Sequence, residues 1–148
     1  MALLLLEAIT PEEPGFIALK AESLRQNVNM LRRLEENWQR GENRFNAPGE
    51  KLIGAFCAGK LVGICGLNRD PFSLQARAGR IRHFYISEAH RGTGIGQQLL
   101  SAVVLEAGVW FDFLNTHAPE SAWRFYEKNG FRPVNDESRV THRLFCAL

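Results

Sequence analysis

The sequence predicts one α/β domain of three layers, in which a mixed and mostly antiparallel sheet of about seven strands has helices on both faces. Three observations support this fold class. A length of 148 residues suits a single domain, so we expect residues 1–148 to form one. Short apolar runs typical of strands alternate with amphipathic segments typical of helices. Two of the apolar runs are joined by the tight-turn sequence Ala58-Gly59-Lys60, which favours antiparallel pairing.

The first half of the chain is expected to form a strand, two short helices and a hairpin. An apolar run predicts a strand over 3–9, and the prolines that follow mark the approach to the first helix. The second helix is clearer, because apolar side chains recur on one face and charged ones lie opposite. The apolar positions are Val28, Leu31, Leu34 and Trp38, and the charged ones are Arg32, Arg33, Glu35 and Glu36. A loop over 41–49 leads to hairpin strands over 51–57 and 61–67.

The second half is expected to add four strands and two helices. A strand over 79–86 runs into a glycine-rich turn and a helix, which we expect Gly108 to end. The buried stripe of that helix is Leu99, Leu100, Val103, Val104 and Ala107. A short strand over 110–114, a helix over 121–129 capped by Gly130, and two strands around 131–134 and 140–147 complete the domain.

The composition excludes several classes of function. A net charge of +2 gives no reason to expect a nucleic-acid or membrane partner. The apolar start, Met1 to Leu6, lacks the basic region of a signal peptide and meets Glu7 at once, so a buried strand and a cytoplasmic protein are expected. Three cysteines without C-x-x-C spacing predict buried thiols and no metal site, although Cys65 as a nucleophile is an alternative.

Residues 81–100 are the most informative part of the chain. Glycines allow a backbone to approach an anion closely, and the first N–H groups of a helix have no partner within it. The pattern therefore predicts diphosphate binding, with an ordinary strand–turn–helix junction as the alternative. A dinucleotide fingerprint would need a third glycine where Gln97 stands, and a P-loop would need a lysine that is absent here.

Two motifs resemble those of the GNAT superfamily of N-acyltransferases. The first is Arg91-x-x-Gly94-x-Gly96, which follows the strand end Phe84-Tyr85-Ile86. The second is Ala122-Trp123-Arg124-Phe125-Tyr126-Glu127-Lys128-Asn129-Gly130-Phe131. The resemblance implies an enzyme that transfers an acetyl group from acetyl-CoA, without a metal, to a primary amine of a small molecule or peptide. It also implies a GNAT-like sheet in which the strands on either side of the glycine-turn helix splay apart to admit pantetheine.

The resemblance also assigns roles to individual residues. The expected coenzyme A contacts are Phe84, Tyr85, Ile86, Arg91, Gly92, Thr93, Gly94, Ile95, Gly96 and Gln97. Phe84 and Ile86 should face one way and Tyr85 the other, because side chains alternate along a strand. Tyr126 stands at the position that protonates the departing thiolate, although a core tyrosine would fit the same helix.

The base that accepts the proton of the amine is less clearly marked. The carboxylate that relatives often carry on the central strand is absent, so His83 is the first candidate, with His117 and Asp112 behind it. A structural role for a lone strand histidine is the alternative. Pro119 stands where many relatives have an asparagine, and Asn115 or Ser121 could replace its contacts with the cofactor.

Other interpretations stay open at this point. Arg77, Arg80 and Arg82 could recognise an acidic acceptor, but a solvated edge is the favoured interpretation, because such a cluster of arginines is more often one. A module that binds or senses acyl-CoA without catalysis, and a binder of other nucleotide phosphates, are the rival functions. The acceptor, the acyl length and the oligomeric state, a homodimer included, are not marked in the sequence.

Overall fold

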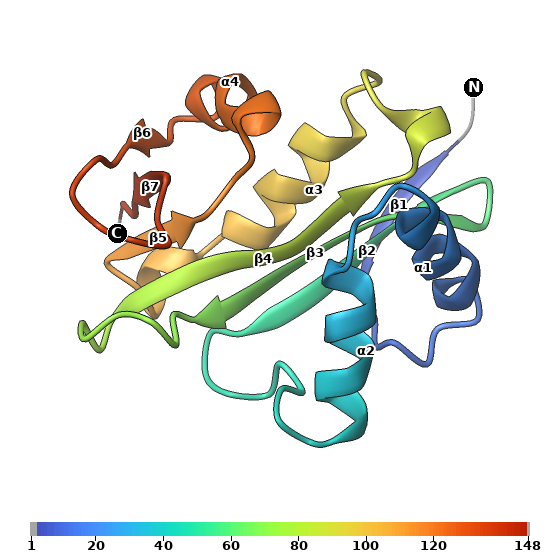
Figure 1. Cartoon of the computed structure of the whole chain (residues 1–148), viewed down its shortest axis with the longest axis horizontal. Coiled ribbons are helices and arrows are strands. Elements are labelled where there is room, and N and C mark those ends of the chain that lie inside the picture. The colour runs from blue at the N-terminus through green and yellow to red at the C-terminus, as the bar shows by residue number, and fades with distance from the viewer. Residues whose placement is uncertain (1–2, 148) are drawn as a thin grey trace.

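The computed structural model describes residues 3–147, which form one seven-stranded sheet and four α-helices (Figure 1). The strands are β1 (Leu4–Ala8), β2 (Lys51–Cys57), β3 (Lys60–Arg69), β4 (Ala78–Ile86), β5 (Phe113–Thr116), β6 (Arg132–Pro133) and β7 (His142–Phe145). The α-helices are α1 (Phe16–Arg25), α2 (Met30–Gln39), α3 (Ile95–Val104) and α4 (Glu120–Lys128). Two 3₁₀ turns, η1 (Glu88–His90) and η2 (Ala107–Val109), flank α3.

The strands run in the order β1-β2-β3-β4-β5-β7-β6. Only β4 and β5 pair in parallel, and the other neighbouring strands pair antiparallel. The predicted mixed and mostly antiparallel sheet of about seven strands is therefore confirmed. The predicted β2–β3 hairpin is confirmed too, and its turn residues Ala58 and Gly59 both have positive φ, at 52° and 81°.

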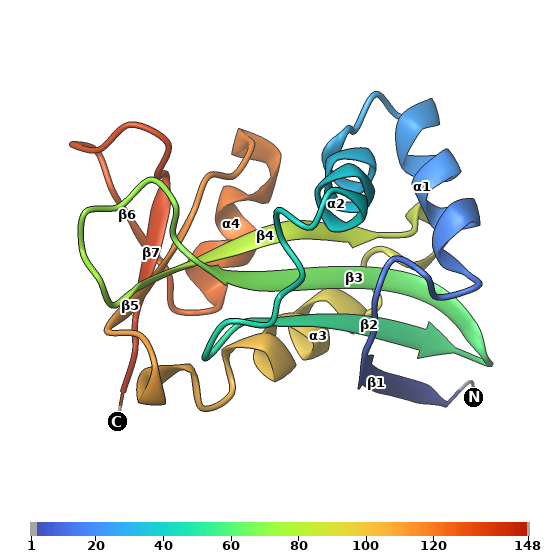
Figure 2. The same ribbon diagram turned by 90° about the horizontal axis from the view of Figure 1, so that it is seen from below.

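Helices cover both faces of the sheet, as expected (Figure 2). α1 and α2 lie over one face and enclose a core that includes Phe16, Leu31 and Leu34. α3 lies over the other face, where its Leu99 joins a second core to which α4 contributes Tyr126. No helix among residues 3–147 is both long enough and apolar enough to span a membrane.

β4 carries a bulge that decides which way its side chains face. His83 and Phe84 together stand opposite Cys65 of β3, and His83 has the left-handed φ of 57°. Phe84 then packs toward the α3 core, whereas Tyr85 packs toward the α1 and α2 core. Ile86 joins Phe84 on the α3 side, so the predicted alternation of these three side chains is confirmed.

β4 and β5 separate soon after they meet. Their pairing covers only three residue pairs, from Ala78 with Phe113 to Arg80 with Asn115. β4 continues to Ile86, so the backbone of residues 81–86 has no neighbouring strand on that side. This is the splay that the resemblance implied, and it leaves main-chain donors and acceptors free beside α3 and α4.

Most predicted boundaries lie within two residues of the observed ones, but two are wrong by three residues or more. α3 ends at Val104 and not at Gly108, which lies in η2. A glycine is needed there because a Cβ would overlap the carbonyl oxygen of Ala147. β5 begins at Phe113, three residues after the predicted start at Trp110, because Trp110 still belongs to the end of η2 and Phe111 is buried in the core. By contrast, Gly130 follows α4 with a φ of 89°, as expected of a residue that ends a helix.

Candidate functional site

A cleft of about 1450 Å³ follows the free edge of β4. Its walls come from α2, β4, the glycine turn, the start of α3, the segment before α4, and α4 itself. Among the predicted site residues that line it are His83, Phe84, Tyr85, Ile86, Arg91, Gly92, Gly94, Gly96, Gln97 and Tyr126. Thr93 and Ile95 do not line it, since Thr93 is exposed on the turn and Ile95 is buried in the core beneath.

The glycine turn presents a row of unused hydrogen-bond donors at one end of the cleft. The first backbone bond of α3 runs from Gln98 N to Gly94 O, at 3.2 Å. The N–H groups of residues 92–97 donate to no other residue that the structure describes. Gly92 and Gly94 have φ of 75° and 85°, and a Cβ at either position would meet nothing within 4 Å. An anion can therefore approach this backbone directly, with the positive end of the α3 dipole behind it.

Arg91 lies beside the turn and is held by the protein itself. Its Nε donates to the carbonyl oxygen of Ile86 at 2.9 Å, and its Nη2 donates to Gln26 Oε1 at 2.8 Å. The guanidinium also lies 5.4 Å from the centre of the Tyr85 ring. Arg91 therefore adds a fixed positive charge at the mouth of the cleft.

Tyr126 lines the cleft and lies among aromatic rings. Its ring centre is 6.4 Å from that of Phe84 on β4 and 5.1 Å from that of Phe131. Only 5% of Tyr126 is exposed, and this burial, followed by the nearby Cys65, raises the pKa of its phenol although Thr116 lowers it in part. The phenol therefore stays protonated at neutral pH and is able to donate a proton within the cleft.

His83 is buried against α2. Its Nδ1 lies 3.0 Å from the carbonyl oxygen of Met30, which can only accept, so Nδ1 carries the proton and Nε2 carries the lone pair. Nε2 is buried and has no hydrogen-bond partner among the described residues. Burial first, and then the charge of Arg82, lowers the pKa of His83 to about 3. The imidazole is thus neutral at physiological pH and weakly basic.

The other predicted candidates for catalysis are placed differently. His117 lines the cleft. Asp112 does not, and its carboxylate instead forms an exposed ion pair with Arg77 at 2.8 Å. Cys65 is fully buried in the α3 core, and burial raises the pKa of its thiol, so it is the expected core cysteine.

Pro119 stands immediately before α4, where the resemblance led us to expect an asparagine. Pro119 caps the helix at φ −65° and lines the cleft, so it shapes the wall without donating a side-chain hydrogen bond. Asn115 cannot substitute, because it is buried and bonded to Asp70 and Arg143. Ser121 lines the cleft and is the remaining candidate.

The far end of the cleft holds residues that sequence reasoning missed. Arg33 and Asn37 of α2, Phe72, and Arg139 of the β6–β7 loop line it together with Arg80 and Arg82. Arg33 belongs to the charged face of its helix, and the sequence pattern predicts that such a face is exposed to solvent. Arg139 lies in a polar loop. Their only sequence signal is the repeated appearance of arginine, and periodicity cannot show that these segments meet.

Comparisons with known proteins support one family. A sequence model of the acetyltransferase (GNAT) domain matches residues 48–133. A solved structure of a candidate acetyltransferase from Exiguobacterium sp. 255-15 shares 28% identity and a TM-score of 0.85, over 97% of this chain and 93% of that one. No curated protein matches the sequence significantly.

More distant structures show the same fold. A ribosomal-protein-alanine N-acetyltransferase from Brucella melitensis has 22% identity and a TM-score of 0.68, over 95% of this chain and 96% of that one. An N-acetylglutamate synthase from Neisseria gonorrhoeae, solved with coenzyme A and N-acetyl-glutamate, has 19% identity and a TM-score of 0.68. That match covers 97% of this chain and 34% of the synthase. Identities this low show the fold alone.

Proposed function

Because the chain belongs to the GNAT acetyltransferase family, whose fold serves acyl-CoA-dependent acyl transfer, we propose that it transfers an acetyl group from acetyl-CoA to a primary amine. The amine attacks directly within a ternary complex, and no covalent acyl-enzyme forms. One observation carries the proposal: a single cleft joins the free N–H groups of the glycine turn, the free edge of β4 and the phenol of Tyr126.

The chain's own groups fit the donor. The N–H groups of residues 92–97 are free, and the open space over Gly92 and Gly94 admits a diphosphate. Main-chain groups of residues 84–86 that face the unpaired edge of β4, apart from the Ile86 carbonyl already bonded to Arg91, are proposed to bind the pantetheine amides. When bound, acetyl-CoA supplies an activated thioester carbonyl and a thiol leaving group. A free β4 N–H is proposed to polarise that carbonyl as negative charge develops on its oxygen.

Tyr126 is proposed to donate a proton to the departing thiolate. A free thiol has a pKa of about 8.5, below that of the phenol, so Tyr126 is proposed to share its proton with the sulfur through a hydrogen bond as the C–S bond breaks and negative charge develops there. Burial raises the pKa of the phenol and so makes it a hydrogen-bond donor more than a strong acid, and the rings of Phe84, Phe125 and Phe131 restrict its position. A protonated and restrained phenol is suited to this role.

His83 is proposed to accept the proton of the attacking amine, with His117 as the second candidate. An alkyl amine with a pKa of about 10.4 is mostly protonated at neutral pH and must lose a proton to attack. The lone pair of His83 Nε2 has no partner among the described residues and is free to accept a hydrogen bond. The burial that lowers the pKa of His83 to about 3 limits how much positive charge this group can hold.

That low pKa favours a second candidate function, a module that binds or senses acyl-CoA without catalysis. Such a module would bind the donor at the glycine turn and would need no base. It shares every donor contact of the enzyme, so binding alone does not separate the two. Release of free thiol in the presence of amines does.

The test is a thiol-release assay with acetyl-CoA and a panel of primary amines. The wild-type protein should release thiol with at least one amine, and Tyr126→Phe should lower kcat by about 100-fold or more while leaving the Kd for coenzyme A unchanged. Equal kcat in the variant would remove the role of Tyr126. Tight coenzyme A binding without thiol release from any amine would favour the non-catalytic module.

Three further expectations stay predictions. They are that residues 1–148 form one N-acetyltransferase domain, that the protein is cytoplasmic, and that the reaction needs no metal. Within residues 3–147 no group of three or more His, Cys, Asp or Glu side chains is arranged to hold a metal ion. The partners proposed are acetyl-CoA and the amine, with neither a nucleic acid nor a membrane.

A further inference from the structure

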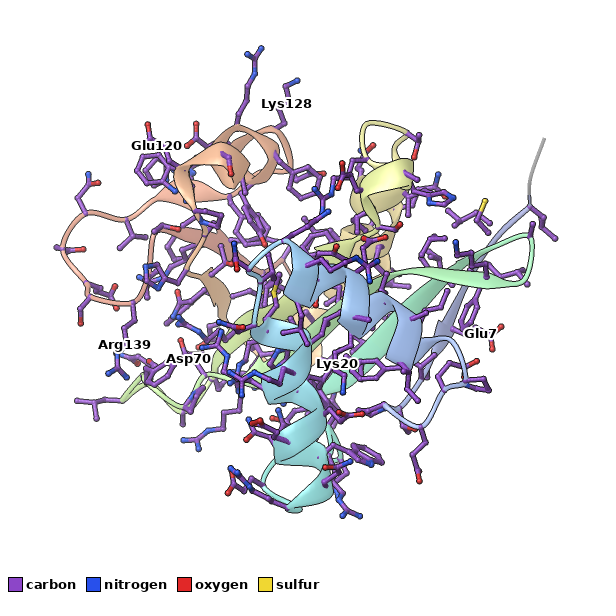
Figure 3. All side chains as sticks on the ribbon, turned by 45° about the vertical axis from the view of Figure 1, so that its right-hand side comes forward. Glu7, Lys20, Asp70, Glu120, Lys128 and Arg139 are labelled. Carbon is purple, nitrogen blue, oxygen red and sulfur yellow. The ribbon has the colours of Figure 1, made fainter. Side chains whose placement is uncertain are left out.

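Four arginines gather at the end of the cleft away from the glycine turn. Arg80 and Arg82 lie on β4, Arg33 comes from α2, and Arg139 comes from the β6–β7 loop. At about 3.3 Å per strand residue, Arg80 is roughly 20 Å along β4 from the residues next to the turn. Figure 3 shows Arg139 close to Asp70, at the edge where their two loops meet. We call these four residues the arginine cluster.

One carboxylate bonds to the cluster. Asp70 is buried and lies 3.4 Å from the guanidinium of Arg80, and it also accepts hydrogen bonds from the Asn115 amide and the Phe72 N–H. Arg80 in turn donates to the carbonyl oxygen of Arg139 at 2.5 Å. Arg80 is therefore a fixed, largely satisfied member of the cluster.

The other three guanidinium groups have no such partner. Those of Arg33, Arg82 and Arg139 make no ion pair and donate no hydrogen bond to any residue between 3 and 147. Arg139 is held instead by the face of Phe72, with 4.4 Å between its guanidinium carbon and the ring centre, and Arg80 lies 4.9 Å from the same ring. Three guanidinium groups without a hydrogen-bond partner in the described part of the chain thus line one end of the cleft, one each from α2, β4 and the β6–β7 loop.

Arg82 shows what this arrangement costs. It is partly buried, and that burial lowers its pKa, as do the neighbouring charges of Arg80 and Arg33. The carboxylates of Asp70 and Glu50 raise the pKa of Arg82 in part, but burial and the like charges of its neighbours outweigh them. Arg77, by contrast, is exposed and paired with Asp112, so the solvated edge expected for these arginines describes Arg77 alone.

On the basis of the proposed acyl transfer, we propose that the arginine cluster binds an anionic group of the acceptor, so that the acceptor is an amine carrying a carboxylate or phosphate group. Guanidinium forks bind both kinds of oxyanion in bidentate fashion. Arg82 precedes His83 in the chain, so an anion on Arg82 would bring the amine of the same molecule toward the proposed base. Arg33 and Arg139 would contact the same anion from the α2 side and from the β6–β7 loop.

Calorimetric titration of amines into the protein saturated with coenzyme A tests this directly. The carboxylate series consists of L-glutamate, γ-aminobutyrate and n-propylamine, which carry two, one and no carboxylates on similar chains. The phosphate pair consists of O-phosphoethanolamine and ethanolamine, which differ only in the phosphate group. Affinity should rise by about tenfold or more for each anionic group that the cluster binds. The comparison of the carboxylate and phosphate series identifies which oxyanion is preferred.

Matched variants locate the effect. Arg82→Gln and Arg33→Gln should each reduce the preference for anionic amines by about tenfold. Arg77→Gln removes a guanidinium only a few residues away and should leave the preference unchanged. Thermal unfolding identifies variants that do not fold, and Arg33 is exposed on α2, so its variant is expected to fold normally.

The outcomes separate this inference from the proposed function. Equal affinity for n-propylamine and L-glutamate, or no binding of any anionic probe, overturns the inference, even if neutral amines release thiol. Selective binding of anionic amines without thiol release supports the anion site and counts against the transferase. If Arg82→Gln weakens coenzyme A more than dephospho-coenzyme A, the cluster binds a phosphate of the donor, and the inference is again overturned.

Discussion

Replacing Gly94 with alanine should weaken coenzyme A binding far more than it weakens the fold. Gly94 precedes α3 with φ 85° and ψ −2°, and an added Cβ would meet nothing within 4 Å. The substitution therefore lowers the stability of the folded protein only by the cost of placing alanine in a left-handed conformation, which is about 1 kcal/mol. The same Cβ would occupy open space beside the free N–H groups of residues 92–97, where the diphosphate is proposed to bind.

The two effects differ in size. A loss of about 1 kcal/mol lowers the Tm of a domain of this length by about 2–4 °C. A hydrogen bond to a charged group contributes about 1.5–3 kcal/mol, so losing even one of those to the diphosphate raises Kd by roughly 10- to 150-fold. Gly94→Ala should therefore show a small shift in Tm and a large loss of affinity.

Gly59 provides a matched control. It lies in the β2–β3 turn with φ 81°, and an added Cβ there also meets nothing within 4 Å. Gly59→Ala should lower Tm by the same few degrees and leave the Kd for coenzyme A unchanged, as measured by thermal unfolding and calorimetric titration. If Gly94→Ala binds coenzyme A as the wild type does, the glycine turn does not hold the diphosphate and the reasoning fails.

Three other predictions follow from buried groups. Because burial lowers the pKa of His83 to about 3, the unfolded chain binds that proton first, and stability falls as the pH drops from about 6.5 toward 3. Between pH 7 and pH 5 the wild type should lose about 2 kcal/mol more than His83→Asn in urea unfolding, and equal losses would refute the low pKa. Asparagine is chosen because it tolerates the φ of 57°. Cys65→Ala should lower stability but keep kcat within about twofold, since direct attack needs no thiol, and a lost kcat with intact coenzyme A binding would revive a nucleophilic cysteine. Gly79→Ala should destabilise the protein by about 1–3 kcal/mol in thermal unfolding, because its Cβ would lie 2.6 Å from Leu114 Cδ2 and 3.0 Å from Phe111 Cγ. An unchanged Tm would show that these two side chains can move aside at little cost.

Local chemistry predicted much of the fold. The turn residues Ala58 and Gly59 fixed the hairpin, and Gly130 ended α4, because positive φ at such positions is decided within a few residues of chain. Gly108 carried the same local signal but serves a distant contact, the close approach of Ala147. Local rules cannot distinguish a glycine that ends a helix from one that makes room for another segment, so the end of α3 was misplaced.

The donor half of the candidate site was predictable, whereas the acceptor half was predicted only in part, since the sequence offered Arg80 and Arg82 as candidates but not Arg33 or Arg139. Most of the donor residues are consecutive in sequence, and of the predicted coenzyme A contacts only Thr93 and Ile95 do not line the cleft. The arginine cluster draws on α2, β4 and the β6–β7 loop, so it exists only once the sheet has formed. Each of its members, taken alone, has the sequence environment of a solvated residue.

The bulge in β4 explains how one strand serves both halves. Strict alternation from Ile81, which faces the α3 core, would place His83 on that same side and Phe84 on the α2 side. The extra residue reverses this, so His83 joins α2 and the arginine cluster while Phe84 meets Tyr126. A left-handed histidine costs about 1 kcal/mol, and its hydrogen bond to the Met30 carbonyl offsets part of that cost. Since strain of this kind persists only where the surrounding structure imposes it, the position of His83 depends on α2 as much as on its own strand.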